Sequence, residues 1–332
     1  MMPFETTRQD QHALRLRWRM ATWVVAGFIL CSVLATGANE NPVPAQTPVL
    51  VRMGLAPNTW QGLNRNDAAA AITAWAKIIM LQRGIPIDVE INLFDSMESL
   101  RASLTDGRVD AVSMATDQFL ELEPSLRPDY VYLLTKDHSF TERYVLLVHR
   151  ESGIHQLAEL RGRRLLVPSN ARTTLALPWL DLIMAQQSLG PVEKVLSDIV
   201  RSEKASKAVL QVFFHKTDAA LVTAEVFAIA CELNPQLHRD LVAIASSPEV
   251  VPSIFFFRPG LTFRFHEELE TAILHAHESP AGLEVLTVFQ GDSMIRQPVG
   301  CLEGARQIIA ERARLRGSSG PDGGPSPAPA AP

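Results

Sequence analysis

The feature of this chain that most constrains its fold is a repeated alternation of short apolar runs with segments of helical spacing. The runs 49–55 and 109–114 are short enough for strands, and between them the segment 68–83 has helical spacing and is followed by Gly84. A second series of the same kind includes the runs 144–149 and 218–222. This alternation predicts an α/β fold with mixed sheets and helices on both faces of each sheet.

Length and composition set the scale of the molecule. The chain has 332 residues, which is long for one domain, so two lobes are expected. Hydrophobic residues make up 47% of the chain and charged residues 20%, which is ample material for a core. The formal net charge is -5, and an acidic chain without clustered Lys and Arg does not suit nucleic acid as a partner.

The N-terminus has the pattern of an export signal. Four arginines, Arg8, Arg15, Arg17 and Arg19, precede an apolar run that ends in small residues near position 38. We predict a signal peptide over residues 1–38, a linker over residues 39–47 and export to the periplasm. The apolar run is also near the length of a membrane span, so an inner-membrane anchor through residues 20–36 is the alternative.

Composition and element order predict how the rest of the chain is divided. Residues 316–332 are rich in Gly, Pro, Ser and Ala and are expected to be a disordered tail. Lobe 1 is predicted over residues 48–141 plus 248–315 and lobe 2 over residues 142–247, with two crossings that act as a hinge. Two consecutive lobes would give a similar pattern. The cleft of the hinged arrangement is the expected place for a ligand.

One polar turn is a candidate site for an anion. Residues 168–174 (PSNARTT) precede an apolar segment, and we expect them to open a helix over residues 173–187. The N-terminus of a helix presents unpaired backbone N–H groups and a partial positive charge. Hydroxyl groups and Arg172 beside it suit an anionic or strongly polar small molecule.

Further candidates lie at the ends of strands that should face the cleft. Trp60 could form an apolar wall for the ligand, and Glu225 would suit an amine. Each candidate also has a structural explanation: helix capping for the hydroxyls, a solvated surface position for the charged groups, and packing for Trp60. The predicted ligand-binding residues are Trp60, Ser113, Thr116, Ser169, Arg172, Thr173, Thr174, Ser202, Lys204 and Thr223.

No catalytic residues, cofactor or metal site are predicted. The sequence has no Gly-x-Ser-x-Gly elbow, no phosphate-binding Gly-rich loop and no His beside a plausible nucleophile. It also lacks Cys-x-x-Cys and His-x-x-x-His spacing. Beyond the signal only Cys231 and Cys301 remain, and we expect two separate buried thiols, although an oxidising compartment would allow a disulfide.

Several short motifs follow one another in the order found in a known family. They are 107–112 (GRVDAV), 157–164 (LAELRGRR), 216–222 (KTDAALV), 246–252 (SSPEVVP) and 279–286 (SPAGLEVL). Together they resemble the periplasmic solute-binding proteins of the phosphate, phosphite and phosphonate class of ABC transporters. The resemblance covers about residues 48–310 of the chain.

The resemblance implies a type II periplasmic-binding fold that closes around a ligand and delivers it to a membrane transporter. The family usually carries Ser-Thr-Ser-Gly at the start of the second-lobe helix, followed by a Pro. Here the Pro matches as Pro178, but the quartet is 171–174 (ARTT). The family also tends to have a His at the start of the next helix, where this chain has Lys204. The ligand therefore does not follow from the resemblance.

These observations predict an exported solute-binding protein without enzymatic activity. It would capture a small, polar, anionic ligand in an interlobe cleft and work with an ABC permease. The alternative is a periplasmic sensor or partner-binding subunit of the same fold without a transport role, which the altered quartet and the Pro-rich tail would suit.

Overall fold

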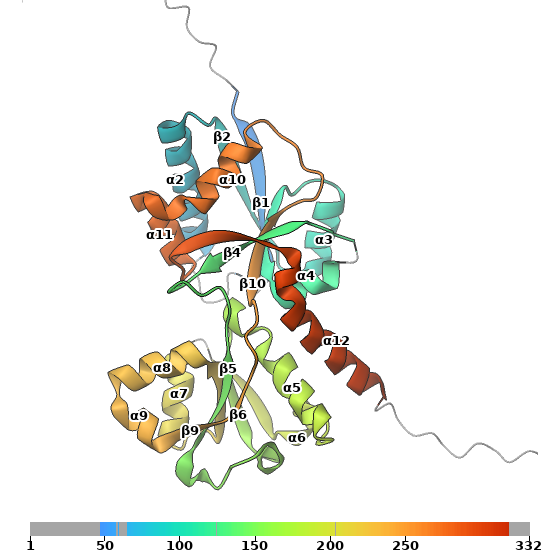
Figure 1. The fold of residues 1–332 in the computed structure, drawn as a ribbon, viewed down its shortest axis with the longest axis vertical. Helices are drawn as coiled ribbons and strands as arrows, with labels where there is room; N and C mark the ends of the chain where they lie inside the picture. The colour runs from blue at the N-terminus through green and yellow to red at the C-terminus, as the bar shows by residue number, and fades with distance from the viewer. Residues whose placement is uncertain (1–46, 58, 60–64, 124, 203, 319–332) are drawn as a thin grey trace, which may run out of the picture. The chain divides into compact units, whose positions relative to one another are not determined.

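The strands of this protein form two separate sheets (Figure 1). The computed structural model describes residues 47–57, 59, 65–123, 125–202 and 204–318. The predicted signal peptide, its anchor alternative and nearly all of the linker lie outside these residues, as do Trp60 and most of the predicted tail. Among the helices of the described residues, none is long and apolar enough to cross a membrane.

The first sheet takes its strands from both ends of the described chain. The first three strands run parallel to one another, and the other three pair with their neighbours in antiparallel fashion. We call the part of the chain built around this sheet lobe 1. In spatial order the strands are β11 (Ser293–Pro298), β4 (Tyr130–Thr135), β10 (Ser253–Phe257), β3 (Ala111–Ala115), β1 (Val49–Leu55) and β2 (Ile87–Leu93).

The second sheet comes from the middle of the chain, and we call the part built around it lobe 2. Its strand β5 is buried along its whole length. Tyr144, Leu146 and Val148 enter the core on one face of the sheet, and Val145 and Leu147 enter the core on the other. In spatial order the strands are β7 (Asp198–Ser202), β6 (Arg164–Pro168), β8 (Ala219–Thr223), β5 (Tyr144–His149) and β9 (Leu241–Ser246).

Helices cover both sheets, so the predicted α/β class with mixed sheets is confirmed. Short 3₁₀ turns occur between the longer elements, and two of them, η3 (Ala171–Thr173) and η4 (Ala276–Glu278), lie at the site described below. The helices are α2 (Arg65–Arg83), α3 (Met97–Thr105), α4 (Thr116–Leu122), α5 (Ala176–Gln186), α6 (Val192–Val195), α7 (Ala205–Phe213), α8 (Ala224–Leu233), α9 (Pro235–Asp240), α10 (His266–Leu274), α11 (Pro280–Val288) and α12 (Glu303–Ser318).

The chain passes between the two sheets through two segments, 136–143 and 247–252, which are paired with each other. Glu142 and Val250 exchange both backbone hydrogen bonds, at 2.8 and 2.9 Å. Next to them, the backbone N–H of Tyr144 donates to the Ser247 hydroxyl at 2.8 Å. The lobe boundaries at 141/142 and 247/248 stay predictions, because the sheets fix where the strands lie but not where a domain ends.

Three strands and three helices (α4, α6 and α9) were missing from the sequence-based assignment. Segments 198–202 and 293–298 form the edge strands β7 and β11, whose polar residues interrupt the apolar runs that mark strands. Segment 130–135 forms β4, which was not assigned. Residues 113–117 form the end of β3 and the start of α4, which follows it directly.

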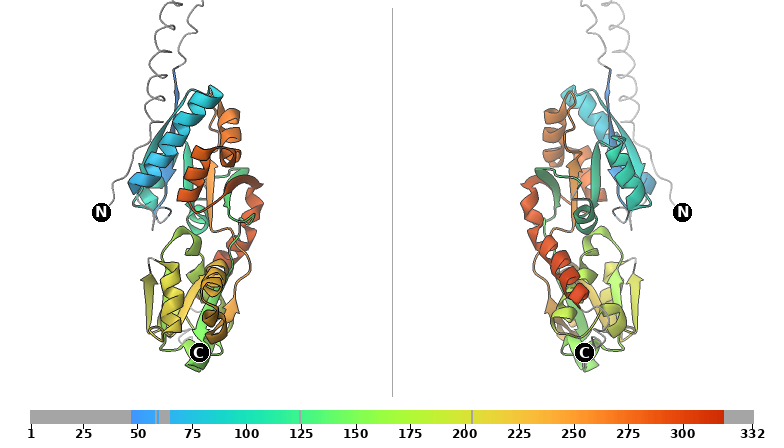
Figure 2. Two further views of the ribbon diagram at one scale, coloured as in Figure 1. Left: turned by 90° about the vertical axis from the view of Figure 1, so that its left-hand side faces the viewer. Right: turned by 90° about the vertical axis from the view of Figure 1, so that its right-hand side faces the viewer.

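The C-terminal helix α12 differs most from expectation. It was assigned to lobe 1 as part of residues 248–315, but its residues Ala305 and Ile308 pack into the lobe 2 core beside Trp179 of α5. The preceding residue Leu302 lies in a lobe 1 core cluster, and Arg306 donates to Glu123 of α4 at 2.8 Å. The helix therefore leaves lobe 1 and continues along α5 (Figure 2).

The predicted disordered tail also begins too early. Residues 316–318 belong to α12, and the rest of the tail lies outside the described residues. Nε of Arg316 lies 2.6 Å from Oδ2 of the buried Asp181, and Nη2 lies 2.8 Å from Glu193. These ion pairs explain why the helix extends past Leu315: Asp181 holds its end against α5.

Asp181 joins α12 to lobe 2. Its carboxylate accepts hydrogen bonds from Arg312 at 2.7 Å and from the backbone N–H of Val192 at 2.9 Å, and it pairs with Arg316. Burial by itself would raise the pKa of Asp181, but the bonds from Arg316, Val192 and Arg312 outweigh burial and lower it. The ionised carboxylate therefore stabilises the folded state above its ordinary pKa, and this contribution is lost as the pH falls through the lowered value.

Asp181→Ala is expected to lower the free energy of unfolding by roughly 2–4 kcal/mol, because it leaves a buried N–H and two arginines without their acceptor. Urea denaturation at neutral pH measures the change. The matched control is Asp198→Ala, whose pair with Arg164 is half exposed on both sides and should contribute under about 1 kcal/mol. Equal losses in the two variants would contradict the role assigned to Asp181.

Candidate functional site

One cavity among the described residues is lined from both lobes. Its volume is about 210 Å³. Lobe 1 contributes strand residues such as Ser113 and helix residues from α2, α10 and α11, whereas lobe 2 contributes Asn170, Ala171 and Arg172. The crossing residue Glu142 completes the lining between them. The cavity therefore includes the predicted interlobe cleft and extends beyond it into lobe 1.

The turn at residues 168–174 reaches this cavity, but it does not open the helix as expected. The 3₁₀ turn η3 comes first, and α5 begins at Ala176 rather than at residue 173. Pro178 explains the difference: it has no N–H and is tolerated only in the first turn of a helix. The backbone N–H of Arg172 donates to the Asn170 side chain at 3.0 Å, and the Tyr144 hydroxyl donates to the Arg172 carbonyl at 2.9 Å. These bonds fix the turn that presents Arg172.

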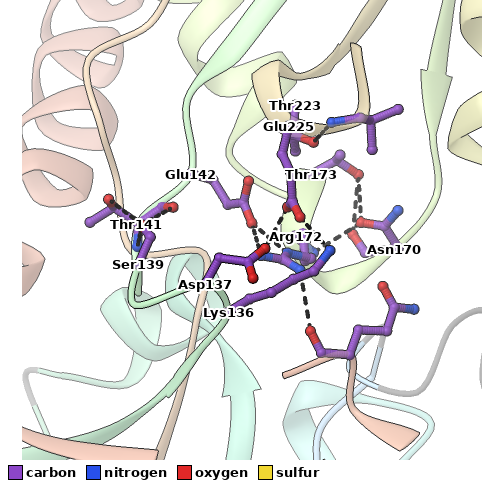
Figure 3. Close-up of polar contacts among 12 residues, drawn as sticks. Lys136, Asp137, Ser139, Thr141, Glu142, Asn170, Arg172, Thr173, Thr223 and Glu225 are labelled. Carbon is purple, nitrogen blue, oxygen red and sulfur yellow. Dashed lines mark hydrogen bonds and ion pairs between the residues drawn. The ribbon is translucent and has the colours of Figure 1, made fainter. Parts of the chain in front are cut away.

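Four charged side chains meet at the mouth of the cavity (Figure 3). The Arg172 guanidinium donates to the buried carboxylate of Glu142 and lies 3.6 Å from Glu225 of α8. Lys136, which follows β4 in lobe 1, pairs with the same Glu225 in lobe 2. Two cations and two carboxylates therefore link the lobes and the crossing segment in one cluster, which we call the charged mouth.

The chain after α11 closes the other side of the charged mouth. Nη1 of Arg172 lies 3.5 Å from the Gln290 carbonyl, which belongs to lobe 1. The next residue, Gly291, has no room for a side chain, because a Cβ there would lie 2.3 Å from Cγ of Leu134 on β4. The missing side chain lets this segment lie against β4 and holds Gln290 over the cavity.

Burial is the main cause of the pKa shifts of two acids near the mouth, Glu142 and Asp117. It raises the pKa of Glu142, opposed by the charge of Arg172 and assisted by the charge of Glu225. Burial also raises the pKa of Asp117 at the start of α4, and the Thr174 hydroxyl of lobe 2 opposes this shift. Both carboxyl groups are therefore easier to protonate than ordinary acids.

The cavity brings together two of the predicted ligand-binding residues, Ser113 and Arg172. Thr116 is fully buried at the start of α4, and its hydroxyl has no hydrogen-bond partner among the described residues. Thr173 is buried and donates to the Pro168 carbonyl at 2.7 Å, so its hydroxyl serves the turn itself. Thr174 faces Asp117 across the lobes.

The remaining predicted residues lie away from the cavity lining. The backbone N–H of Ser169 donates to the Ser202 carbonyl, and the Ser202 hydroxyl donates to the Lys204 carbonyl at 3.0 Å. Ser202 ends β7 instead of starting a helix, and the exposed Lys204 precedes α7. Thr223 caps α8 by accepting from the Val226 N–H at 3.3 Å. Trp60 lies outside the described residues.

Sequence reasoning missed Lys136, Glu142, Asn170 and Gln290 as site residues. Glu142 carried a usable signal, since it stands directly before the apolar strand run and within the expected crossing. Asn170 was part of the turn that was singled out, but only as a neighbour. Lys136 and Gln290 carried none, because they reach the site through the packing of β4 and α11, which are far apart in sequence.

One group of side chains in the described part of the chain has donor atoms for a metal ion. His149, Glu151 and His215 place possible ligand atoms within 4.8 Å of one another. This group offers three donors, fewer than a closed zinc site needs, and Nδ1 of His149 already accepts the Glu151 N–H at 3.2 Å. It shares no residue with the charged mouth. Cys231 and Cys301 are both free thiols.

Residues 63–297, more than half of the chain, match the family model described as ABC transporter, phosphonate, periplasmic substrate-binding protein. No curated protein matches the sequence.

Solved structures with the same fold have low sequence identity to this chain. A Xanthomonas citri protein bound to chloride ion shares 18% identity at a TM-score of 0.58, covering 81% of this chain and 99% of that one. PhnD1 from Prochlorococcus marinus, solved with methylphosphonate, shares 14% identity at a TM-score of 0.55, covering 80% and 98%. A binding protein component of an ABC phosphonate transporter from Pseudomonas aeruginosa shares 14% identity at a TM-score of 0.57, covering 82% and 89%.

Glu142→Gln is expected to gain stability relative to the unsubstituted protein as the pH rises. The raised pKa of Glu142 means that its protonated form favours folding, and this contribution is fully present below its ordinary value of 4.5 and lost as the pH rises through the raised value. Thermal unfolding from about pH 4 to about pH 8 measures the difference.

In the control variant, the change in stability with pH should run in the opposite direction. Backbone hydrogen bonding from His155 lowers the pKa of the exposed Glu159, so Glu159→Gln should lose stability relative to the unsubstituted protein as the pH rises. If the stability of both variants relative to the unsubstituted protein changed in the same direction with pH, burial would not raise the pKa of Glu142.

Proposed function

The chain belongs to the family of periplasmic substrate-binding proteins of phosphonate ABC transporters, and we propose that it captures a small anionic solute at the charged mouth and delivers it to an ABC permease. The family is periplasmic and is a transport component, so the proposal contains no catalytic step. The proposed ligand-contacting residues are Arg172 and Lys136, which were reached by different routes, one from the sequence and one from the structure.

The observation that carries this proposal is the position of Arg172. Its guanidinium lies in the cavity lining, about a quarter exposed, and is held by a turn of lobe 2 while it faces residues of lobe 1. Guanidinium groups bind phosphonate, sulfonate and carboxylate oxygens through charge-assisted hydrogen bonds. A ligand oxyanion at Arg172 would therefore also contact the other lobe, which favours closure around it.

The two carboxylates of the charged mouth compete with an anionic ligand for Arg172 and Lys136. When all four side chains are ionised, Arg172 and Lys136 form ion pairs with Glu142 and Glu225. An entering anion must therefore compete with these two carboxylates for the cations. Protonation of Glu142, which its raised pKa favours, frees Arg172 for the ligand. Anion binding would therefore take up a proton, and Glu225 would remain for a cationic group on the ligand.

Arg172→Ala is expected to weaken the binding of an anionic ligand about 10- to 100-fold, the range of one lost charge-assisted hydrogen-bonding group. Isothermal titration with methylphosphonate, methanesulfonate and acetate measures the change. Arg143→Ala is the control, because Arg143 lies next to Glu142 in the crossing segment but forms a half-exposed pair with Glu249. If none of the three anions binds, or if both variants bind equally, anion capture at Arg172 is wrong.

The pH dependence of binding gives an independent test at Glu142, where a substitution should strengthen anion binding instead of weakening it. Anion affinity of the unsubstituted protein should rise as the pH falls, because protonated Glu142 no longer competes for Arg172. Glu142→Gln should bind anions more tightly at neutral pH and lose most of this pH dependence. A variant that binds more weakly and keeps the pH profile would contradict competition between Glu142 and the ligand.

A further inference from the structure

The cavity extends from the charged mouth into the interior of lobe 1. Its inner wall lies between the sheet and helices α2, α10 and α11, which cover one face of that sheet (Figure 1). Aliphatic, aromatic and thioether groups form the wall, including Met53, Ile72, Trp75, Phe255, Leu286 and Met294. A space therefore lies next to the charged mouth, in a region where apolar side chains are ordinarily close-packed.

Two polar groups of the inner wall, the hydroxyls of Thr135 and Tyr132, already have partners. The Thr135 hydroxyl donates to Asp292 at 2.7 Å. The Tyr132 hydroxyl is engaged by Glu270 and Arg296, and burial is the main cause of its raised pKa. An occupant beside Thr135 and Tyr132 therefore meets hydroxyls that already have partners, and the mainly apolar wall suits an apolar occupant.

The cavity has a definite capacity. A cavity of about 150 Å³ lined by apolar side chains holds the six carbons of benzene. By the same proportion, the whole volume of about 210 Å³, the charged mouth included, has room for at most roughly eight carbon atoms. Met53 and Met294 in the wall have flexible thioether side chains that adapt to chains of different shape.

Charge at one end and an apolar interior behind it define a class of ligand. We infer that the ligand is an anionic amphiphile with one alkyl or aryl tail: its head group lies at Arg172 and Lys136, and a tail of up to roughly eight carbons fills the inner cavity of lobe 1. This inference rests on the proposed anion capture and adds the substrate class. A head group alone, such as methylphosphonate, would leave the inner cavity empty.

A chain-length series on the unsubstituted mature protein tests the inference. The probes are methyl-, butyl-, hexyl-, octyl- and dodecylphosphonate, each titrated calorimetrically below its micelle concentration. Affinity should rise about threefold to fourfold for each added methylene group and level off beyond roughly eight carbons. The heat-capacity change of binding should become more negative along the same series. Equal affinities for methyl- and octylphosphonate would overturn the inference.

Variants that fill the cavity locate the tail. Val285→Phe on α11 and Val89→Phe on β2 place a larger side chain in the wall and should weaken octylphosphonate at least tenfold more than methylphosphonate. The matched control is Leu283→Phe, an exposed position on α11, which should leave both affinities within about twofold. An equal loss for both ligands in the two cavity variants would place the tail elsewhere and overturn the inference.

A neutral ligand separates failure of this inference from failure of the proposed function. Octan-1-ol has the same tail without the anion and should bind weakly, with affinity reduced by Val285→Phe. If octanol binds but no phosphonate does, the anion capture is wrong and the apolar site is supported. If methylphosphonate binds through Arg172 but octanol and octylphosphonate gain nothing from their tails, the proposed function holds and the tail site is wrong.

Discussion

The pairing of the two crossing segments is the constraint on which the site depends. Glu142 and Val250 exchange both backbone hydrogen bonds, and Tyr144 and Ser247 continue the pairing into lobe 2. Segments that connect two lobes are where hinge motion takes place. The same pairing holds the buried Glu142 at the charged mouth, where its carboxylate pairs with Arg172.

Burial and charge then act against each other at the mouth of the cavity. Removing Glu142 from water disfavours its ionised form, whereas the neighbouring guanidinium favours it. The result is a cluster with no net charge in which a ligand anion can replace the Glu142 carboxylate at Arg172. Behind it, the satisfied polar groups of Tyr132 and Thr135 leave the lobe 1 interior apolar. One cavity thus combines a charged region at its mouth with an apolar region in the interior of lobe 1.

Helix α12 adds a third connection between the lobes. Arg306 pairs with Glu123 of lobe 1, while Arg312 and Arg316 pair with the buried Asp181 of lobe 2. Any motion about the crossing segments must be accommodated by this helix, because it is attached at both ends. The start of α12 also lies against a crossing segment, because a Cβ at Gly304 would be 3.4 Å from the Glu249 carbonyl oxygen.

The sequence by itself determined the α/β class, most of the strands and the family, because apolar periodicity and short motifs are local properties of the chain. It also identified the turn that carries Arg172, but not the late start of α5 that Pro178 imposes on it. Only the tertiary structure decided that Lys136, Glu142 and Gln290 meet Arg172, that α12 belongs with α5, and that lobe 1 keeps a cavity. These outcomes depend on contacts between residues distant in sequence and on how completely side chains fill the space between elements, and neither leaves a periodic signal in the chain.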